Sequence, residues 1–536
     1  MPLYTTNIPS NITLGRRRVL KKIIVQKDSY YDSVFLMLIN KDVKQFPGVT
    51  EAVVSMGTEV NLELLKDMGL YDDEVANATP NDLIIAIEGE SEDVLEDAAG
   101  SAKKMLSKKG GGGEGEEYRP TSLAAAKQAV PDANMVVISL PGEYAAREVR
   151  KALSDDMHVM LFSDNVSLED EIRLKEMAKE KGLLMMGPDC GTAIINGKPL
   201  CFANVVRDGD IGLVGASGTG LQEVSCSIEK FGAGISQAIG TGGRDLKSEK
   251  VGGTMMLMGI EALAADPATK VIGVISKPPA ESVAKKVISA LEKTGKPCVV
   301  HFIGLPKQSA SGNVHYAGNL EECAGMCVAL SEGKDYTETV FTIPESEIDS
   351  LLSRETEKMS SDQKFLRGLY TGGTLADEAV ILLNDRLGGV HAFDSKDPNL
   401  VLKDPHTSEK HTIVDLGEDV FTVGRPHPMI DPSTREDRIK KEANDRSMAV
   451  MLLDIVLGYG SHSDPAGAIL DSLADAKEKA AAAGGYLSII CSITGTEGDF
   501  QKIKEQKRKL ESIGCVVMPS NYQASMLALK IMDKVA

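Results

Sequence analysis

Residues 210–220 read DIGLVGASGTG, and residues 221–232 continue as LQEVSCSIEKFG. An apolar strand therefore runs into a turn of glycine, serine and threonine, and an amphipathic helix follows. The free N–H groups of a first helical turn and the helix dipole favour an anion, and glycine lets the backbone approach it. The pattern predicts a phosphate site at Ser217, Gly218, Thr219 and Gly220. It is equally consistent with a tight turn in which Ser217 or Thr219 caps the helix.

The same alternation of strand and helix runs along most of the chain. Apolar stretches such as 134–140, 158–162 and 449–456 are each followed by a helical pattern, and the strands end in glycine and polar residues. This order predicts an α/β protein with parallel sheets covered on both faces. Ligands of such sheets bind beyond the carboxyl ends of the strands. We therefore expect a ligand loop at Gly187, Pro188, Asp189 and Cys190.

Composition excludes several classes of protein. The 536 residues carry a net charge of −19, and a nucleic-acid binder usually has a basic field. The amino terminus lacks an apolar signal-peptide core, and no apolar run is long enough to span a bilayer. The eight cysteines are scattered and predict small buried side chains in a reducing cytoplasm, without a metal site.

One segment is a clear linker. Residues 108–118 begin KKGGGGEGEE and cannot contribute to a core. They separate a small αβ sandwich module at 1–107, of ferredoxin-like or regulatory type, from the rest of the chain. A second, polar joint is expected at 342–362.

Several motifs together resemble a known family. The turns GPDCG (187–191), GASGT (215–219) and IGTGG (239–243) resemble GPNCPG, SRSGTL and VGIGGD of the succinyl-CoA synthetase α subunit, an NDP-forming acyl-CoA ligase. Three later segments resemble the carboxy-terminal domain of its β subunit: YTGGTLADEAV (370–380), MLLDIVLGYGSHSDPA (451–466) and ITGTEGD (493–499). With the added module and the GRPHPMIDP segment (424–432), the layout resembles the FdrA family.

The resemblance implies a domain plan. It predicts a degenerate CoA-binding Rossmann-like domain at 119–205 and an α-subunit ligase-like, flavodoxin-like domain at 206–340. A flavodoxin-like domain similar to the end of the β subunit is predicted at 363–536.

The resemblance also implies a mechanism. In that family an acyl phosphate forms, a histidine carries a phosphoryl group, and two helix amino termini bind it. Here His315 stands where the carrier is expected, although it also reads as a loop histidine beside a core strand. The second helix end is predicted at Gly458, Gly460 and Ser461. Arg425 and His427 form either an anion clamp or a structural turn, and His462 either caps a helix or contacts the ligand.

Two departures from the family bear on cofactors. The GFTG-type CoA turn has no counterpart between 110 and 133, which counts against CoA binding, and no ATP-grasp domain is found on this chain. The family's GEIGG loop corresponds to residues 274–279, VISKPP, which lack its acid. The expected ligand is therefore phosphate or an acyl phosphate, with no metal.

Three functions remain open. The first is a subunit of a transferase that handles acyl or carbamoyl phosphate, which the FdrA resemblance associates with oxamate carbamoyltransferase in anaerobic allantoin and purine catabolism. The second is an NDP-forming acyl-CoA synthetase subunit. The third is a scaffold without catalysis. The first two favour an enzyme, and all three imply separate protein subunits or a homo-oligomer.

Overall fold

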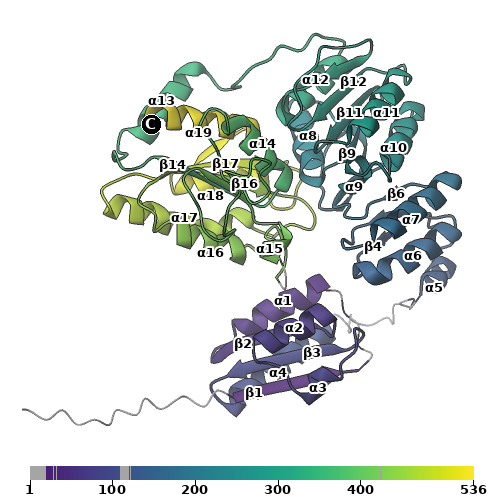
Figure 1. Cartoon of the computed structure of the whole chain (residues 1–536), viewed down its shortest axis with the longest axis vertical. Helices are drawn as coiled ribbons and strands as arrows, with labels where there is room; N and C mark the ends of the chain where they lie inside the picture. Colours follow the sequence, from purple (N-terminus) through teal and green to yellow (C-terminus); the bar gives the residue numbers. More distant parts are fainter. Residues whose placement is uncertain are drawn as a thin grey trace, which may run out of the picture. The chain divides into compact units, whose positions relative to one another are not determined.

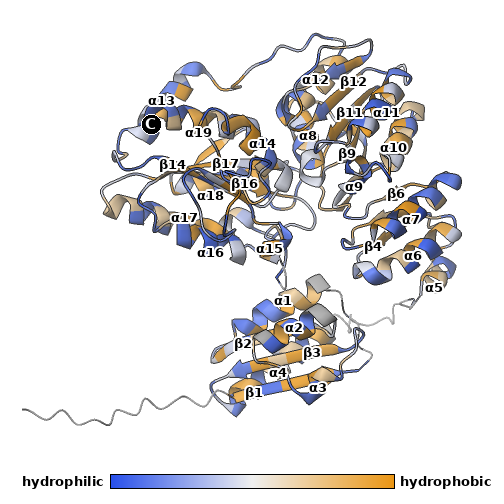
Figure 2. Ribbon diagram, in the orientation of Figure 1, coloured by the Kyte–Doolittle hydropathy of each residue, from blue (hydrophilic) through white to orange (hydrophobic). Residues whose placement is uncertain are grey.

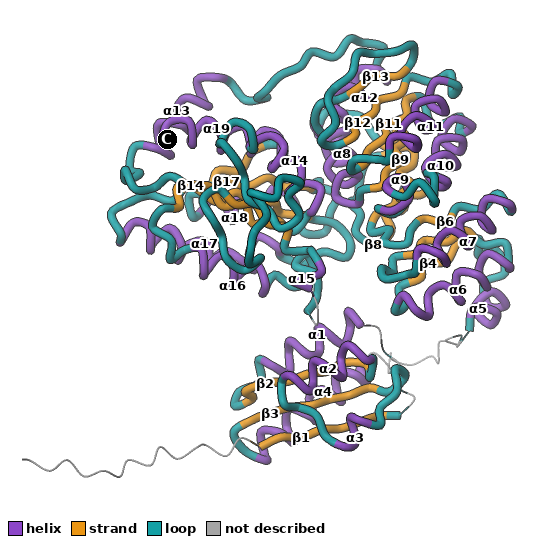
Figure 3. The backbone as a smooth tube through the Cα atoms, viewed as in Figure 1, coloured by secondary structure: helices purple, strands orange, loops and turns teal. Residues whose placement is uncertain are grey.

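The computed structural model describes residues 20–27, 29, 31, 33–108, 120, 122–422 and 425–535. The chain forms two compact units, one of Met1–Arg119 with Gly424–Pro426, and one of Pro120–Val423 with His427–Ala536. Apart from Lys108, the predicted linker lies outside the described residues, as does the amino-terminal stretch to residue 19. Figure 3 shows helices and strands interleaved along the described chain.

The amino-terminal unit is a small αβ sandwich. Its antiparallel sheet has the order β1-β3-β2, formed by Leu20–Gln26, Leu83–Gly89 and Val49–Met56. The central strand β3 is buried on both faces. Ile85 and Ile87 pack toward α1 (Ser33–Lys44) and α4 (Glu92–Lys108). Ile84 and Ala86 pack in a separate cluster with α2 (Glu59–Asp67) and α3 (Asp73–Ala76).

The second unit begins with a three-stranded parallel sheet. Its order is β4-β5-β6, formed by Met135–Ile138, His158–Leu161 and Met185–Met186. The helices of this part are α5 (Leu123–Ala129), α6 (Gly142–Ser154) and α7 (Leu168–Glu180). The apolar face of α6 buries Val149 and Leu153 against this sheet.

A seven-stranded sheet follows, with the order β13-β12-β11-β9-β10-β7-β8. Five strands are parallel: β9 (Asp208–Ala216), β10 (Ile235–Gly240), β11 (Val271–Ser276), β12 (Cys298–Phe302) and β13 (Val314–Tyr316). The hairpin of β7 (Thr192–Ile195) and β8 (Lys198–Cys201) adds antiparallel strands at one edge. The remaining helices of this part are α8 (Gly218–Lys230), α9 (Arg244–Lys247), α10 (Thr254–Ala265), α11 (Glu281–Glu292) and α12 (Leu320–Ser331).

The last sheet is parallel and has the order β15-β14-β16-β17-β18. Its strands are Thr412–Asp415, Phe365–Tyr370, Met448–Val456, Ser488–Thr494 and Val516–Met518. Its helices are α14 (Gly373–Leu383), α15 (Asp419–Thr422), α16 (Ser433–Glu442), α17 (Pro465–Ala482), α18 (Ile503–Ser512) and α19 (Asn521–Val535), and α13 (Glu345–Thr356) precedes the sheet. All nine residues of β16 are buried, as expected for a central parallel strand.

The α/β architecture with parallel sheets is confirmed. Hydrophobic residues concentrate along the strands and on one side of the helices (Figure 2). One apolar core is shared by helices of the last two sheets, and includes Leu221 of α8, Leu320 of α12, Leu375 of α14 and Leu527 of α19. The seven- and five-stranded sheets are therefore packed into one body.

A buried polar hub lies within this shared core, at the amino terminus of α19. Asn521 makes hydrogen bonds with three other elements. Its backbone N–H donates to Glu223 (3.2 Å), and its side-chain amide donates to Glu378 (2.8 Å). Its Oδ1 accepts the hydroxyl of Tyr370 (3.1 Å). Burial raises the pKa of Glu378 to about 7.

The raised pKa of Glu378 makes the free energy of unfolding depend on pH. Because its pKa is raised from 4.5 in the folded state, the native chain holds a proton that the unfolded chain loses between pH 4.5 and about 7. This group therefore contributes stability that is lost as pH rises through that window, by about 3 kcal/mol. We expect urea unfolding from pH 4.5 to 8 to show a weaker decline for Glu378→Gln than for the wild type. Parallel curves would contradict the assignment.

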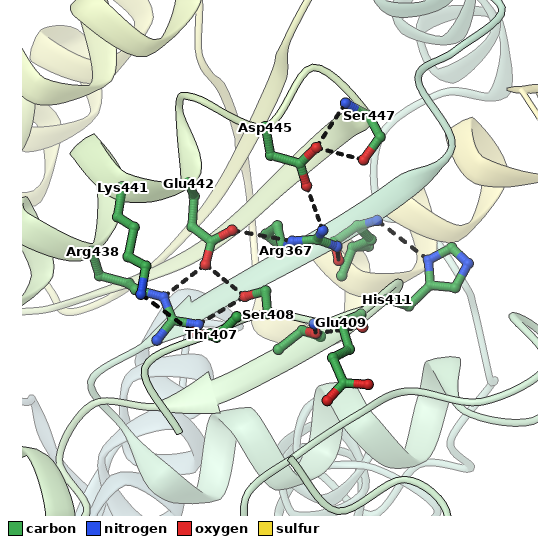
Figure 4. A network of polar contacts seen from close by, with 12 residues as sticks. Arg367, Thr407, Ser408, Glu409, His411, Arg438, Lys441, Glu442, Asp445 and Ser447 are labelled. Atoms are coloured by element: carbon green, nitrogen blue, oxygen red, sulfur yellow. Dashed lines mark hydrogen bonds and ion pairs between the residues drawn. The ribbon is translucent and has the colours of Figure 1, made fainter. Parts of the chain in front are cut away.

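A second polar network lies near the amino-terminal ends of β14 and β15 (Figure 4). Arg367 donates to Glu442 (3.1 Å) and to Asp445 (2.6 Å), and Arg438 donates to Glu442 (2.7 Å) and to Ser408 (2.7 Å). Arg367, Arg438 and Glu442 are each 5% exposed or less. Through Ser408, this network connects the segment before β15 to Arg438 and Glu442 of α16.

Candidate functional site

The DIGLVGASGTG stretch forms the strand-to-helix turn that the sequence predicts. β9 ends at Ala216, Ser217 is the N-cap of α8, and its hydroxyl accepts the N–H of Gly220 at 3.1 Å. The cap occupies one of the free N–H groups of the first turn. Gly218 and Thr219 keep theirs and are only partly buried.

A second helix amino terminus meets this turn. The Ser217 hydroxyl lies 2.5 Å from the hydroxyl of Thr374, in the first turn of α14, although the two residues are 157 positions apart. A Cβ on Gly372, the N-cap of α14, would lie 3.0 Å from the methyl group of Thr219. Figure 1 shows α8 and α14 on the facing sides of the two sheets. The amino termini of two helices, each the positive end of its helix dipole, therefore lie next to each other, and such an arrangement favours an anion.

A buried aspartate fixes the turn that leads into α14. Asp454 of β16 accepts the N–H groups of Thr371 (2.9 Å) and Gly372 (2.7 Å) and pairs with Arg435 of α16. Asp454 is 0% exposed and Arg435 is 5% exposed. Asp454 takes the two N–H groups before the helix, whereas those of Gly373 and Thr374 belong to the first helical turn and have no acceptor within the helix.

Two titratable groups lie next to Gly373. A Cβ at this position would lie 2.3 Å from Oδ2 of Asp415, at the end of β15, and 3.7 Å from Nζ of Lys277, which follows β11. Lys277 also pairs with Asp377 at 2.7 Å. Desolvation by the surrounding chain raises the pKa of Asp415 to about 8, so this carboxyl is mainly protonated at neutral pH. The start of α14 thus lies beside an ammonium group that is paired with Asp377 and beside the neutral acid Asp415.

His427 lies beside the same aspartate. A Cβ on Gly417 would lie 2.4 Å from Nε2 of His427 and 3.1 Å from Oδ1 of Asp415. The ring of His427 packs against Phe202 with centroids 5.9 Å apart. Desolvation lowers the pKa of His427 to about 4, so the imidazole is neutral at pH 7.

Arg425 is exposed and is grouped with the amino-terminal unit, whereas His427 belongs to the second unit. The two residues of the predicted clamp are therefore described in separate units, and their pairing stays a prediction.

The predicted ligand loop at 187–190 packs against another glycine turn. A Cβ on Gly242 would lie 2.2 Å from the carbonyl oxygen of Pro188, and one on Gly240 would lie 2.5 Å from Sγ of Cys190. Cys190 is buried, and desolvation raises the pKa of its thiol to about 12, so it is not a nucleophile at neutral pH. Asp189 is exposed.

His315 lies away from the facing helix ends. It sits within β13 and pairs with Val299 of β12. β13 is three strands from β9, roughly 14 Å at the usual spacing of strands. The structure therefore does not bring His315 to Ser217. His315 instead borders a surface depression with Lys307, Gln308 and Tyr316.

The loop at 458–461 contacts residues 201–204 rather than the turn at Ser217. Tyr459 donates its N–H to Ala203 at 2.9 Å, and a Cβ on Gly460 would lie 2.8 Å from the ring of Phe202. Ser461 is buried, and no partner of its hydroxyl is found among the described residues. His462 caps a turn, since its Nδ1 accepts the N–H of Asp464 at 3.0 Å.

The sequence predicts the second helix end at 458–461 and assigns no role to the residues around α14. Gly373, Thr374, Lys277 and Asp415 together complete the centre in the structure. The signal that could have found them is the TGG at 371–373, a second strand that ends in glycine and threonine before a helix. Among the described residues, no three His, Cys, Asp or Glu side chains are grouped to hold a metal ion, and no helix is long and apolar enough to cross a bilayer.

Three family descriptions match parts of the chain. "AllF, heavy metal-associated domain" matches residues 19–121, "CoA binding domain" matches 206–304, and "CoA-ligase" matches 369–531. Residues 1–157 contain neither Cys nor His, so the first match comes without thiolate or imidazole metal ligands.

The CoA matches correct one expectation. The missing GFTG turn counted against CoA, yet a CoA-binding family matches the residues that include the start of α8, and a CoA-ligase family matches those that include the start of α14. The expectation was wrong because it rested on one turn near 110–133, whereas the CoA-binding match begins at 206.

Individual proteins are also similar to this chain, one of them over nearly its full length. The chain is 44% identical over 514 residues to the uncharacterized protein YahF of Escherichia coli, covering 96% of this chain and 99% of YahF. It is 28% identical over 180 residues to succinate–CoA ligase [ADP-forming] subunit alpha 2 of Archaeoglobus fulgidus, covering 32% of this chain and 60% of that subunit.

A solved acetyl-coenzyme A synthetase of Ca. Korarchaeum cryptofilum is 14% identical, with a TM-score of 0.32, covering 77% of this chain and 86% of that one. The full-length identity to YahF, joined to the CoA-binding and CoA-ligase matches, shows that the chain belongs to the YahF family of succinyl-CoA-synthetase-like proteins.

Proposed function

We propose that this NDP-forming acyl-CoA-ligase-like chain binds an acyl phosphate at the meeting amino termini of α8 and α14. The observation that carries the proposal is the 2.5 Å contact between Ser217 and Thr374, which brings two helix ends from two sheets together. The partly exposed N–H groups of Gly218, Thr219 and Gly373 supply donors for phosphoryl oxygens. Lys277 supplies a positive charge beside them.

The proposed reaction exchanges phosphate for a thiol. The sulfur of CoA attacks the carbonyl carbon of the acyl phosphate, a C–S bond forms, the C–O bond to phosphate breaks, and inorganic phosphate leaves. The thiol proton passes to solvent or to the departing phosphate. The helix ends stabilise the negative charge that moves onto the phosphate.

Carbamoyl transfer is the second candidate, and would make the chain part of an oxamate carbamoyltransferase in allantoin or purine catabolism. Carbamoyl phosphate is a small acyl phosphate, and a site made of helix ends, Lys277 and a protonated Asp415 recognises the phosphate and carbonyl groups that both substrates share. Here the nitrogen of oxamate, in place of the CoA sulfur, would attack the carbonyl carbon. The resemblance to FdrA favours this candidate.

Turnover separates the two candidates. Purified protein, with and without the products of neighbouring genes, is incubated with acetyl phosphate and CoA, or with carbamoyl phosphate and oxamate, and released phosphate is measured. We expect acceptor-dependent release in one pair, reduced at least tenfold in the double variant Ser217→Ala, Thr374→Val. Ser350→Ala, an exposed serine on α13, is the control. Equal release by the double variant and the wild type would refute the site. Absence of release in every mixture would favour a scaffold.

The α-subunit relatives carry subunit names in multi-subunit ligases. We infer that this chain likewise acts with separate subunits, and co-purification with neighbouring gene products tests this inference.

A further inference from the structure

One histidine lies at the proposed acyl-phosphate centre, and its orientation sets what it can do. Nδ1 of His427 accepts the backbone N–H of Met429 at 3.2 Å. A nitrogen that accepts an N–H hydrogen bond carries a lone pair and no proton, so in the neutral ring the proton lies on Nε2. This tautomer is assigned from the hydrogen bond.

Nε2 faces the turn between β15 and α15. A Cβ on Gly417 would touch Nε2 at 2.4 Å and Oδ1 of Asp415 at 3.1 Å, and Oδ2 of Asp415 reaches the start of α14 at Gly373. Among the described residues, the hydrogen bond found for the imidazole of His427 is the one that Nδ1 accepts from Met429. The ring packs against Phe202, and the acidic groups near it are Asp454, whose charge acts on it, and Asp415.

An Nε2–H group can donate a hydrogen bond but cannot attack phosphorus, because a nucleophilic nitrogen needs a free lone pair. To free Nε2, the ring proton would have to move to Nδ1 and face the N–H of Met429, donor against donor. The backbone N–H of Met429 therefore favours the tautomer in which Nε2 of His427 is a hydrogen-bond donor, and disfavours the tautomer in which Nε2 could carry a phosphoryl group.

We propose that His427 donates its Nε2–H to the carbonyl oxygen of the bound acyl phosphate and that it is not phosphorylated. The inference rests on the proposed function. As the acceptor attacks, the C=O π electrons move to oxygen, and the developing oxyanion is stabilised by the Nε2–H bond. The oxyanion then collapses, the C–O bond to phosphate breaks, and inorganic phosphate leaves. The proton of the attacking acceptor passes to solvent or to the departing phosphate, and the proton of His427 stays on Nε2 throughout.

Histidine-selective 15N NMR tests this without requiring turnover. The resonance of His427 is identified by its loss in His427→Gln. We expect the Nε2–H tautomer to persist from pH 5 to 8, and its shift to change when acetylphosphonate, an uncleavable acyl phosphate mimic, is added. A tautomer with the proton on Nδ1, titration near pH 6.5, or no change with the mimic would overturn the proposal.

Kinetics give a second readout. His427→Ala should lower kcat by about 10²–10³-fold, the usual cost of removing one oxyanion donor, with an unchanged affinity for inorganic phosphate. His427→Gln, whose amide can donate, should recover part of the rate. Acid-labile phosphate on His427, or an unchanged kcat in His427→Ala, would refute the donor role. If the wild-type protein did not bind inorganic phosphate, the proposed function itself would be refuted instead.

Discussion

Replacing Asp454 by alanine is expected to lower the free energy of unfolding by about 3–5 kcal/mol, because it leaves a buried charge without its partner. Arg435 would lose its carboxylate, and the N–H groups of Thr371 and Gly372 would lose their acceptor. The start of α14 would then no longer be held against Ser217. Urea unfolding measures the loss of stability, and phosphate titration of the folded variant measures the loss of the site.

The control for this change is Asp471→Ala, an exposed aspartate on α17, which should alter the free energy of unfolding by less than about 0.5 kcal/mol. Asp454→Asn keeps the size of the side chain and removes its charge. If Asp454→Ala were as stable as the control and bound phosphate normally, the positioning role of Asp454 would be excluded.

Glu442→Ala should have a similar effect on stability and none on the site. It removes the carboxylate shared by Arg367 and Arg438, both buried, and Arg438 keeps only neutral acceptors (Figure 4). We expect a loss of about 3–5 kcal/mol in urea unfolding.

Glu436→Ala is the matched control, since Glu436 makes only a 3.5 Å surface pair with Lys440 and should cost at most about 1 kcal/mol. Because the Glu442 network lies near the opposite ends of the strands from Ser217, folded Glu442→Ala should bind phosphate with normal affinity. A weakened affinity at full folding would show that this network also shapes the site.

The strands and helices of the fold follow from local patterns in the sequence. The apolar run before Gly215 and the amphipathic stretch after Gly220 predict β9 and α8, and the polar ends of the strands predict where a ligand should bind. The antiparallel hairpin of β7 and β8 was not predicted, because its pairing to β10 depends on a distant strand.

The sequence predicts only the α8 side of the site and not the α14 side. Ser217 and its neighbours are marked by local sequence, whereas the approach of Thr374 depends on how two sheets pack through one apolar core. The neutral state of Asp415 and the tautomer of His427 depend on neighbours that are adjacent only in the folded chain. His315 was singled out by the motif around it, but strand order separates it from Ser217.

Binding of inorganic phosphate tests the central claim most directly. Phosphate is titrated by 31P NMR with three proteins: the wild type, the double variant Ser217→Ala/Thr374→Val and the control Ser350→Ala. This titration reports binding at the helix-end site itself and requires neither an acceptor nor partner subunits. We expect saturable line broadening with the wild type and the control, and at least a tenfold weaker affinity with the double variant. Equal affinity in all three proteins, or no binding by the wild type, would contradict it.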